Sequence, residues 1–275
     1  MSLRLTLRRW PHPPGVEAEA PDLLPERLGR LSRSAIEALR VRLGREEQRV
    51  GDLFEVDGTP GEDVTLAGDL SAFVRLGAGM TRGRLVVKGN AGLAAGSRMS
   101  GGRLEISGDA GARAGEGMTG GVLVVRGSTG DDLGGPPPGA ARGVNRGAIL
   151  VAGNAGARAG RRMRRGLIAI GGGAGPLAGT EMLAGTLVIA GHAGDGIGTW
   201  MRRGTILLGT GSPPPASAFA DAGSGRFSFW ALYDEALRFA GATIPEAWRE
   251  GRFRRYVGDR SGGGLGEILV PEGGR

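Results

Sequence analysis

Six of the seven methionines in this 275-residue chain recur at a fixed spacing, and this repeat limits the possible folds more than any other feature. Successive spacings along the chain are 19, 19, 45, 19 and 19, with the long gap between Met118 and Met163. Val144 divides this gap into 26 and 19, so it occupies the missing position and leaves a seven-residue insertion. A period of about 20 residues is typical of a solenoid. We call the repeated position the methionine column, and its members are Met80, Met99, Met118, Val144, Met163, Met182 and Met201.

Each member of the column is followed by a glycine at the third position after it and by aliphatic residues at the fifth and seventh. Met80, for example, is followed by Gly83, Leu85 and Val87. Alternating aliphatics bounded by glycine predict a short strand with one buried face. Helical solenoid repeats need more than about 30 residues, so helices do not fit this unit. We therefore predict an all-β fold, a right-handed parallel β-helix of about seven 19-residue coils, with the methionines stacked inside it as core.

A second pattern, G-x-x-G-x-x-x-G, precedes the strand in every repeat after the first, as in Gly89, Gly92 and Gly96. The residue after its first glycine belongs to types that tolerate left-handed backbone. We therefore predict a left-handed turn at this position, and we interpret His192 as a turn residue rather than a catalytic one. The position is occupied by Asp69, Asn90, Asp109, Ser128, Asn154, Gly173 and His192.

The chain divides into three segments, of which residues 1–60 form the predicted N-terminal strand and helix cap. An alternating strand at Leu3–Leu7 precedes a proline-rich turn at Pro11–Pro14. A helix is predicted over Ser32–Leu43, because Ile36, Leu39 and Leu43 fall on one helical face. Residues 61–211 form the β-helix, and an insertion near 128–142 predicts a protruding loop, which either contacts a partner or has no role.

Residues 212–275 comprise a linker, Ser212–Pro215, and an aromatic-rich segment that we predict to be mainly helical or irregular. An amphipathic helix is predicted over residues 229–240. The segment carries too many large apolar groups for a solvated tail, so it packs on the rod, on a partner or on both. Its candidate docking residues are Phe229, Trp230, Tyr233 and Tyr256.

Composition argues against catalysis by the isolated chain. Cysteine is absent, and the two histidines, His12 and His192, are too far apart in sequence for a usual zinc site or catalytic triad. We therefore expect no catalytic, cofactor-binding or metal-binding residues in this chain. No apolar run long enough for a membrane span occurs, and we expect a cytoplasmic protein that binds neither membrane nor nucleic acid.

The net charge is +7, and Lys88 is the only lysine, so nearly all positive charge is arginine. At the second position after the methionine column, Arg146 and Arg165 fall on adjacent coils, and Arg203 follows two coils later. Stacked like charges repel one another. These arginines either extend into water or pair with nearby acids, or they form a face for an acidic partner or for a polyglutamate-bearing cofactor.

The two glycine and methionine patterns resemble two relatives: the C-terminal β-helical domain of glutamate synthase, and the C subunit of formylmethanofuran dehydrogenase with its bacterial counterpart in the formyltransferase/hydrolase complex. The flanks favour the C subunit family. Val16–Asp22 resembles its acidic N-terminal segment, and Arg255–Asp259 with Gly264–Leu269 resembles its C-terminal signature. Leu265 departs from the pattern, which has lysine there in many relatives.

The resemblance implies a non-catalytic scaffold subunit of an enzyme complex in one-carbon metabolism. Its partners would be an amidohydrolase-like subunit, a formyltransferase subunit and a molybdopterin-enzyme-like subunit, with a methylofuran or methanofuran cofactor elsewhere in the complex. The arginine-rich composition favours the complex of a methylotrophic bacterium, which converts formyl-tetrahydromethanopterin to formate through formyl-methylofuran. The alternatives are a molybdenum or tungsten formylmethanofuran dehydrogenase and a stand-alone module like that of glutamate synthase.

Overall fold

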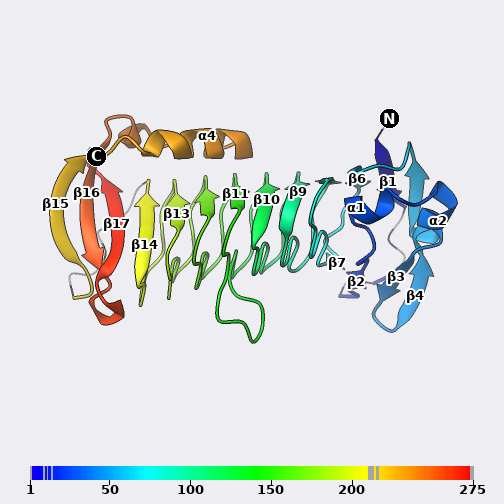
Figure 1. The fold of residues 1–275 in the computed structure, drawn as a ribbon, viewed down its shortest axis with the longest axis horizontal. Coiled ribbons are helices and arrows are strands. Elements are labelled where there is room, and N and C mark those ends of the chain that lie inside the picture. The colour runs from blue at the N-terminus through cyan, green and yellow to red at the C-terminus, as the bar shows by residue number, and fades with distance from the viewer. Residues whose placement is uncertain are drawn as a thin grey trace.

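The computed structural model describes residues 2–8, 10, 12–13, 15–209, 214 and 217–272. In these residues the protein is mostly β and forms an elongated rod, with the two ends of the chain at opposite ends of the rod (Figure 1). One sheet of 13 strands runs the length of the rod, and a second sheet of four strands lies at the N-terminal end.

Eight consecutive strands of the large sheet, each parallel to the next, form the central part of the rod. Leu104 pairs with Leu123, one repeat later, and Leu123 pairs with Ile149, one repeat and the insertion later. The sequence period is therefore the distance along the chain from one strand to its neighbour. The strands are β6 (Asp63–Ala67), β8 (Arg84–Lys88), β9 (Ser100–Ile106), β10 (Gly120–Val125), β11 (Ala148–Val151), β12 (Leu167–Ile170), β13 (Thr186–Ile189) and β14 (Arg203–Leu208).

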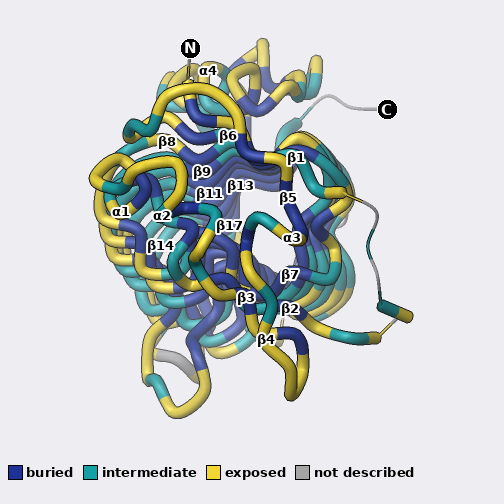
Figure 2. The backbone as a smooth tube through the Cα atoms, turned by 90° about the vertical axis from the view of Figure 1, so that its right-hand side faces the viewer, coloured by how far each residue is buried: buried dark blue, intermediate teal, exposed yellow. Residues whose placement is uncertain are grey.

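All seven members of the methionine column are fully buried in the interior of the coils, which Figure 2 shows in dark blue. The glycine at the third position after each methionine has a packing role. A Cβ on Gly185 would lie 2.9 Å from Met163 Cε, and one on Gly204 would lie 2.7 Å from Met182 Cε. The glycine of one coil therefore leaves the space that the methionine of the preceding coil fills.

We expect Met118→Ala to lower the free energy of unfolding by about 2–5 kcal/mol, because a closely packed coil interior cannot collapse around the missing side chain. Met118→Leu conserves volume and should cost less than about 1.5 kcal/mol. Denaturant titration of both variants tests this, and equal stabilities would show that the column is not tightly packed.

The N-terminal segment closes one end of the rod. β1 (Leu3–Leu7) is parallel to β6 and antiparallel to β5 (Phe54–Asp57), so it extends the large sheet. The small sheet joins β2 (Ala18–Glu19), β3 (Arg40–Leu43), β4 (Glu46–Arg49) and β7 (Phe73–Val74), beside the short helices α1 (Pro25–Leu28) and α3 (Val50–Leu53). Of the predicted proline-rich turn, Pro11 and Pro14 lie outside the described residues.

The helix predicted over Ser32–Leu43 is wrong in its second half. α2 covers only Arg33–Glu37, where the Ser32 hydroxyl accepts a hydrogen bond from the backbone N–H of Ala35 at 3.2 Å. The later residues form β3, between β2 and β4. Ile36 and Leu43 are both buried, but a strand buries the second, because Arg40–Leu43 alternates between exposed and buried residues.

The C-terminal segment, predicted to be mainly helical or irregular, also contains three strands that the prediction missed. β15 (Ala220–Arg226), β16 (Arg252–Gly258) and β17 (Leu265–Pro271) continue the large sheet, and β17 is parallel to β14. The predicted helix is confirmed as α4 (Trp230–Ala240), and short 3-10 turns follow at Glu246–Trp248 and Arg260–Gly262. The predicted linker Ser212–Pro215 lies outside the described residues except for Pro214.

The left-handed turn predicted after the first glycine is wrong as well, because none of its seven residues has positive φ. The side chains of Asn90, Asp109, Ser128 and Asn154 instead cap the next coil. Asn90 Oδ1 accepts a hydrogen bond from the N–H of Asp109 at 2.9 Å, and Asp109 Oδ1 accepts one from the N–H of Ser128 at 2.7 Å. His192 is exposed on this corner. Among the described residues other than glycine, left-handed backbone recurs at two other corners, occupied by Arg75, Ala94, Arg113, Asp132, Arg158 and Leu177, and by Arg98, Arg162, Glu181 and Trp200.

Candidate interaction site

The outer face of the large sheet is apolar over its C-terminal half. In β10–β14 the residue between the two inward-facing aliphatics is itself buried, at Val124, Leu150, Ala169, Val188 and Leu207. The equivalent residues of β6 and β9 are Thr65 and Glu105. Strands buried on both faces read as continuous apolar runs. The apolar runs of these strands are therefore a sequence signal for a covered outer face.

Helix α4 lies along this outer face and packs against β11 and β12 (Figure 1). Leu237 and Ala240 of α4 and the nearby Trp248 are buried in the same apolar cluster. The candidate docking residues Phe229, Trp230 and Tyr233 pack against that cluster, whereas Tyr256 packs against the coil interior. The structure thus places all four against the rod of their own chain, which is one of the alternatives that the sequence left open.

The predicted arginine face comprises Arg146, Arg165 and Arg203, and all three residues are exposed. Because Ala148 pairs with Leu167, Arg146 and Arg165 occupy equivalent positions on adjacent coils. None of the three forms an ion pair within the part of the chain that the structure describes. Arg82, at the equivalent position of an earlier coil, differs because its Nε donates to Glu62 at 2.7 Å.

The insertion forms a protruding loop between β10 and β11 (Figure 1). Gly135 still follows the regular path of the coil, because its carbonyl accepts a hydrogen bond from the N–H of Gly117. Gly143 rejoins that path, because its N–H donates to the carbonyl of Arg162. Only residues 136–142 therefore leave the coil, a shorter range than the predicted one. We call residues 136–142 the inserted loop.

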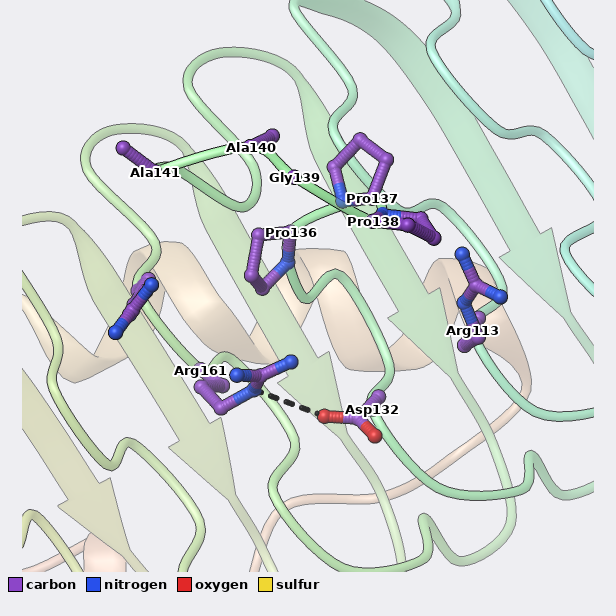
Figure 3. A pocket seen from close by; sticks show the side chains of 10 residues that line it. Arg113, Asp132, Pro136, Pro137, Pro138, Gly139, Ala140, Ala141 and Arg161 are labelled. Atoms are coloured by element: carbon purple, nitrogen blue, oxygen red, sulfur yellow. Dashed lines mark hydrogen bonds and ion pairs between the residues drawn. The ribbon is translucent and has the colours of Figure 1, made fainter.

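A pocket of about 500 Å³ lies under the inserted loop, between its prolines and the arginines of the coils (Figure 3). Asp132 lines it and accepts hydrogen bonds from Arg158 Nη2 at 2.8 Å and from Arg161 Nε at 3.0 Å. On the other side, Arg113 Nη2 lies 2.6 Å from the carboxylate of the buried Glu116. The carboxylates around this pocket are thus already paired with arginines of the same chain.

The pairing with arginines determines the protonation state of Asp132. Burial alone would raise the pKa of Asp132, but hydrogen bonds and charges from Arg158 and Arg161 outweigh burial and hold that pKa below its usual value. A carboxylate held in its charged form is a weak proton acceptor and cannot donate a proton near neutral pH. Asp132 is therefore held as a carboxylate that faces the arginines of this pocket.

No group of three or more histidine, cysteine, aspartate or glutamate side chains that could hold a metal ion occurs among the described residues. The two histidines are far apart: His12 lies beside Trp10 and Gln48 in the N-terminal segment, and His192 lies on a late coil. No described helix has the length and apolar character needed to cross a membrane.

Comparison with known proteins identifies relatives of one kind. An 88-residue stretch is 36% identical to the C subunit of tungsten-containing formylmethanofuran dehydrogenase 2 from Methanothermobacter marburgensis and from Methanothermobacter thermautotrophicus. These alignments cover 30% of this chain and span only 33% of the length of each relative. A scan against models of protein families finds no match.

A structural comparison covers nearly the whole chain. A chain in the crystal structure of the formyltransferase/hydrolase complex (FhcABCD) from Methylorubrum extorquens, solved with methylofuran, superposes with a TM-score of 0.86. The two sequences are 32% identical, and the superposition covers 98% of this chain and 100% of the other. This match and the curated relatives show that the chain belongs to the family of C subunits of formylmethanofuran dehydrogenases and formyltransferase/hydrolase complexes.

Proposed function

We propose that this chain is a non-catalytic scaffold subunit of a formyltransferase/hydrolase complex in the one-carbon metabolism of a methylotrophic bacterium. The observation that carries the proposal is the match to a complete chain of such a complex. The rod itself supports it, because the pocket under the inserted loop has its carboxylates paired with arginines. A rod of stacked coils offers long, stiff faces on which other subunits can be positioned.

We also propose a handedness for the coils, and a cellular compartment and partner subunits for the complex. We assign the coils to a right-handed parallel β-helix, because crossovers between parallel strands of one sheet are right-handed in about 98% of cases. The complex would act in the cytoplasm, with the methylofuran-type cofactor bound by other subunits. Those partners would be amidohydrolase-like, formyltransferase and molybdopterin-enzyme-like subunits. The C subunit of a tungsten or molybdenum formylmethanofuran dehydrogenase is the second candidate, which the curated relatives favour.

Co-expression of the tagged chain with the neighbouring genes of its genome tests this function. We expect the chain to copurify with formyltransferase and amidohydrolase-like subunits, and the complex to convert formyl-tetrahydromethanopterin to formate. The purified chain alone should show neither formyl transfer nor formamide hydrolysis. Activity of the chain alone would contradict the scaffold role, and copurification with a glutamine amidotransferase would favour a glutamate-synthase-like module.

The arginine face offers a separate prediction about assembly. Replacing Arg146, Arg165 and Arg203 with glutamine should weaken assembly at low salt and have little effect at high salt, because screening already weakens exposed charge pairs. Arg82→Gln, at the equivalent position but paired with Glu62, is the control. The measurement is the yield of complex on a size-exclusion column at two salt concentrations. Wild-type yields at both would show that the face is only solvated.

A further inference from the structure

A second hollow lies on the other side of the inserted loop. It has a volume of about 480 Å³ and is lined by Arg142, Arg162, Glu181, Leu183, Trp200 and Arg202. We call it the Trp200 groove. It shares Ala141 and Arg162 with the pocket under the loop, so the two hollows adjoin along one edge of the rod. The coil residues that line the two hollows run from Arg113 to Arg202 and so come from several successive coils, a span that suits an extended chain better than a compact ligand.

Trp200 is the most unusual residue of this groove, because a large apolar side chain is exposed at a corner with left-handed backbone. The residue is 60% exposed and has φ of 59°. The equivalent corner of earlier coils carries Gly79, Arg98, Glu181 or another small or polar residue. The coil therefore does not need tryptophan at this position, and glycine would adopt this backbone with less strain.

A buried carboxylate fixes the backbone at Trp200. Asp259, only 4% exposed, accepts a hydrogen bond from the N–H of Trp200 at 2.8 Å. The same carboxylate accepts from the N–H of Ser261 at 2.8 Å and from its hydroxyl at 2.7 Å. The turn after β16 is thus tied to the corner of the last coil, and the backbone that carries the indole is fixed there.

The charges of the groove define what it attracts. Arg162 and Glu181 form an ion pair with each other and cancel. Arg142 and Arg202 are exposed, and neither forms an ion pair within the described ranges. Guanidinium groups bind carboxylates in a matching planar geometry, and tryptophan and arginine are among the side chains most enriched where protein interfaces are strongest.

We propose that the Trp200 groove docks an acidic, extended segment of another subunit, with an apolar side chain of that segment against the indole and its carboxylates on Arg142 and Arg202. This inference rests on the proposed function, because it requires that the chain is a subunit of a complex. It adds a binding surface that the arginine face does not include, and it gives the inserted loop a role as one wall of that surface.

Trp200→Gly tests the proposal in the co-expressed complex, because the change removes the indole and suits the left-handed backbone. We expect the melting temperature of the free chain to stay within about 3 °C of the wild type and its affinity for the other subunits to fall at least about tenfold. Leu177→Gly is the matched control, since Leu177 is also exposed (38%) and left-handed (φ 62°) but lies outside the groove. Wild-type assembly by Trp200→Gly would overturn the proposal.

A crosslinking measurement identifies the occupant, and the assembly of the wild-type chain separates this proposal from the proposed function. A photo-crosslinking phenylalanine at position 200 of the intact complex should crosslink to an acidic segment of another subunit. A crosslink to a basic or neutral segment, to a non-protein component or to no other subunit contradicts the proposal. If the wild-type chain joins no complex, the proposed function fails; if it assembles and Trp200→Gly assembles equally well, only the docking proposal fails.

Discussion

Gly89→Ala is expected to destabilise the protein by more than about 4 kcal/mol, a loss in the range that marks severe backbone strain. A Cβ on Gly89 would overlap the carbonyl oxygen of Gly68 on the neighbouring coil. Its φ of 151° is also one that a residue with a side chain rarely adopts. Because the obstacle is backbone and not the end of a flexible side chain, the two coils would have to move apart along their hydrogen-bonded corner.

Gly79→Ala is the matched control for this change. Gly79 also has positive φ, 72°, but a Cβ there would meet nothing within 4 Å. Arg98, Glu181 and Trp200 occupy the same corner of other coils. We therefore expect a cost of only about 1–2 kcal/mol, the usual penalty of left-handed backbone for a residue with a side chain. Similar unfolding free energies for the two variants would show that the coils pack less closely than the structure indicates.

These two glycines show which part of the fold can be predicted from the sequence. The same local preferences recur in every repeat. The 19-residue period and the alternation of residues such as Leu85 and Val87 are therefore enough to predict the strands and which strands are neighbours. The period does not reveal why a particular residue is needed at each corner. Gly89 permits close backbone contact, Gly185 makes room for a methionine, and Asn90 caps the next coil, although all three read as turn residues in the sequence.

The ends of the rod are harder to predict, because no repeat constrains them. Helical spacing of the aliphatics extends the helix predicted from Ser32 as far as Leu43. The alternation within Arg40–Leu43 indicates a strand instead, and the pairing with β2 and β4 determines the outcome. β17 has a short apolar run at Ile268–Val270, but this run does not show which strand it pairs with. Its partner β14 is distant in the sequence, with Ile206 opposite Ile268. Such pairing depends on tertiary contacts and not on local propensity.

The two candidate interaction sites also differ in how far the sequence predicts them. The arginine face can be located from the period alone, because equivalent positions stack. The Trp200 groove cannot, because it forms where the inserted loop, the last coil and the turn at Ser261 meet. A single tryptophan at a coil corner is the available signal, and in the sequence an exposed tryptophan does not differ from a buried one.

Deleting residues 219–275 is expected to have a larger effect than either glycine substitution. It removes α4 from the apolar outer face, and it removes β17 from β14. An exposed apolar patch and an open parallel edge both promote association. We expect the truncated chain to retain its β circular-dichroism signal, to bind a hydrophobic dye strongly and to aggregate instead of eluting as a monomer.

The two causes can be separated with substitutions taken from the chain itself. β6 has Thr65 at the outward position where β10, β11, β13 and β14 have Val124, Leu150, Val188 and Leu207. Replacing these four residues with threonine in the truncated chain should abolish most of the dye binding. End-to-end association should persist, because the edge of β14 stays open. If dye binding instead remains at the level of the unsubstituted truncation, the exposed apolar surface lies elsewhere, and α4 is not the cover of this face.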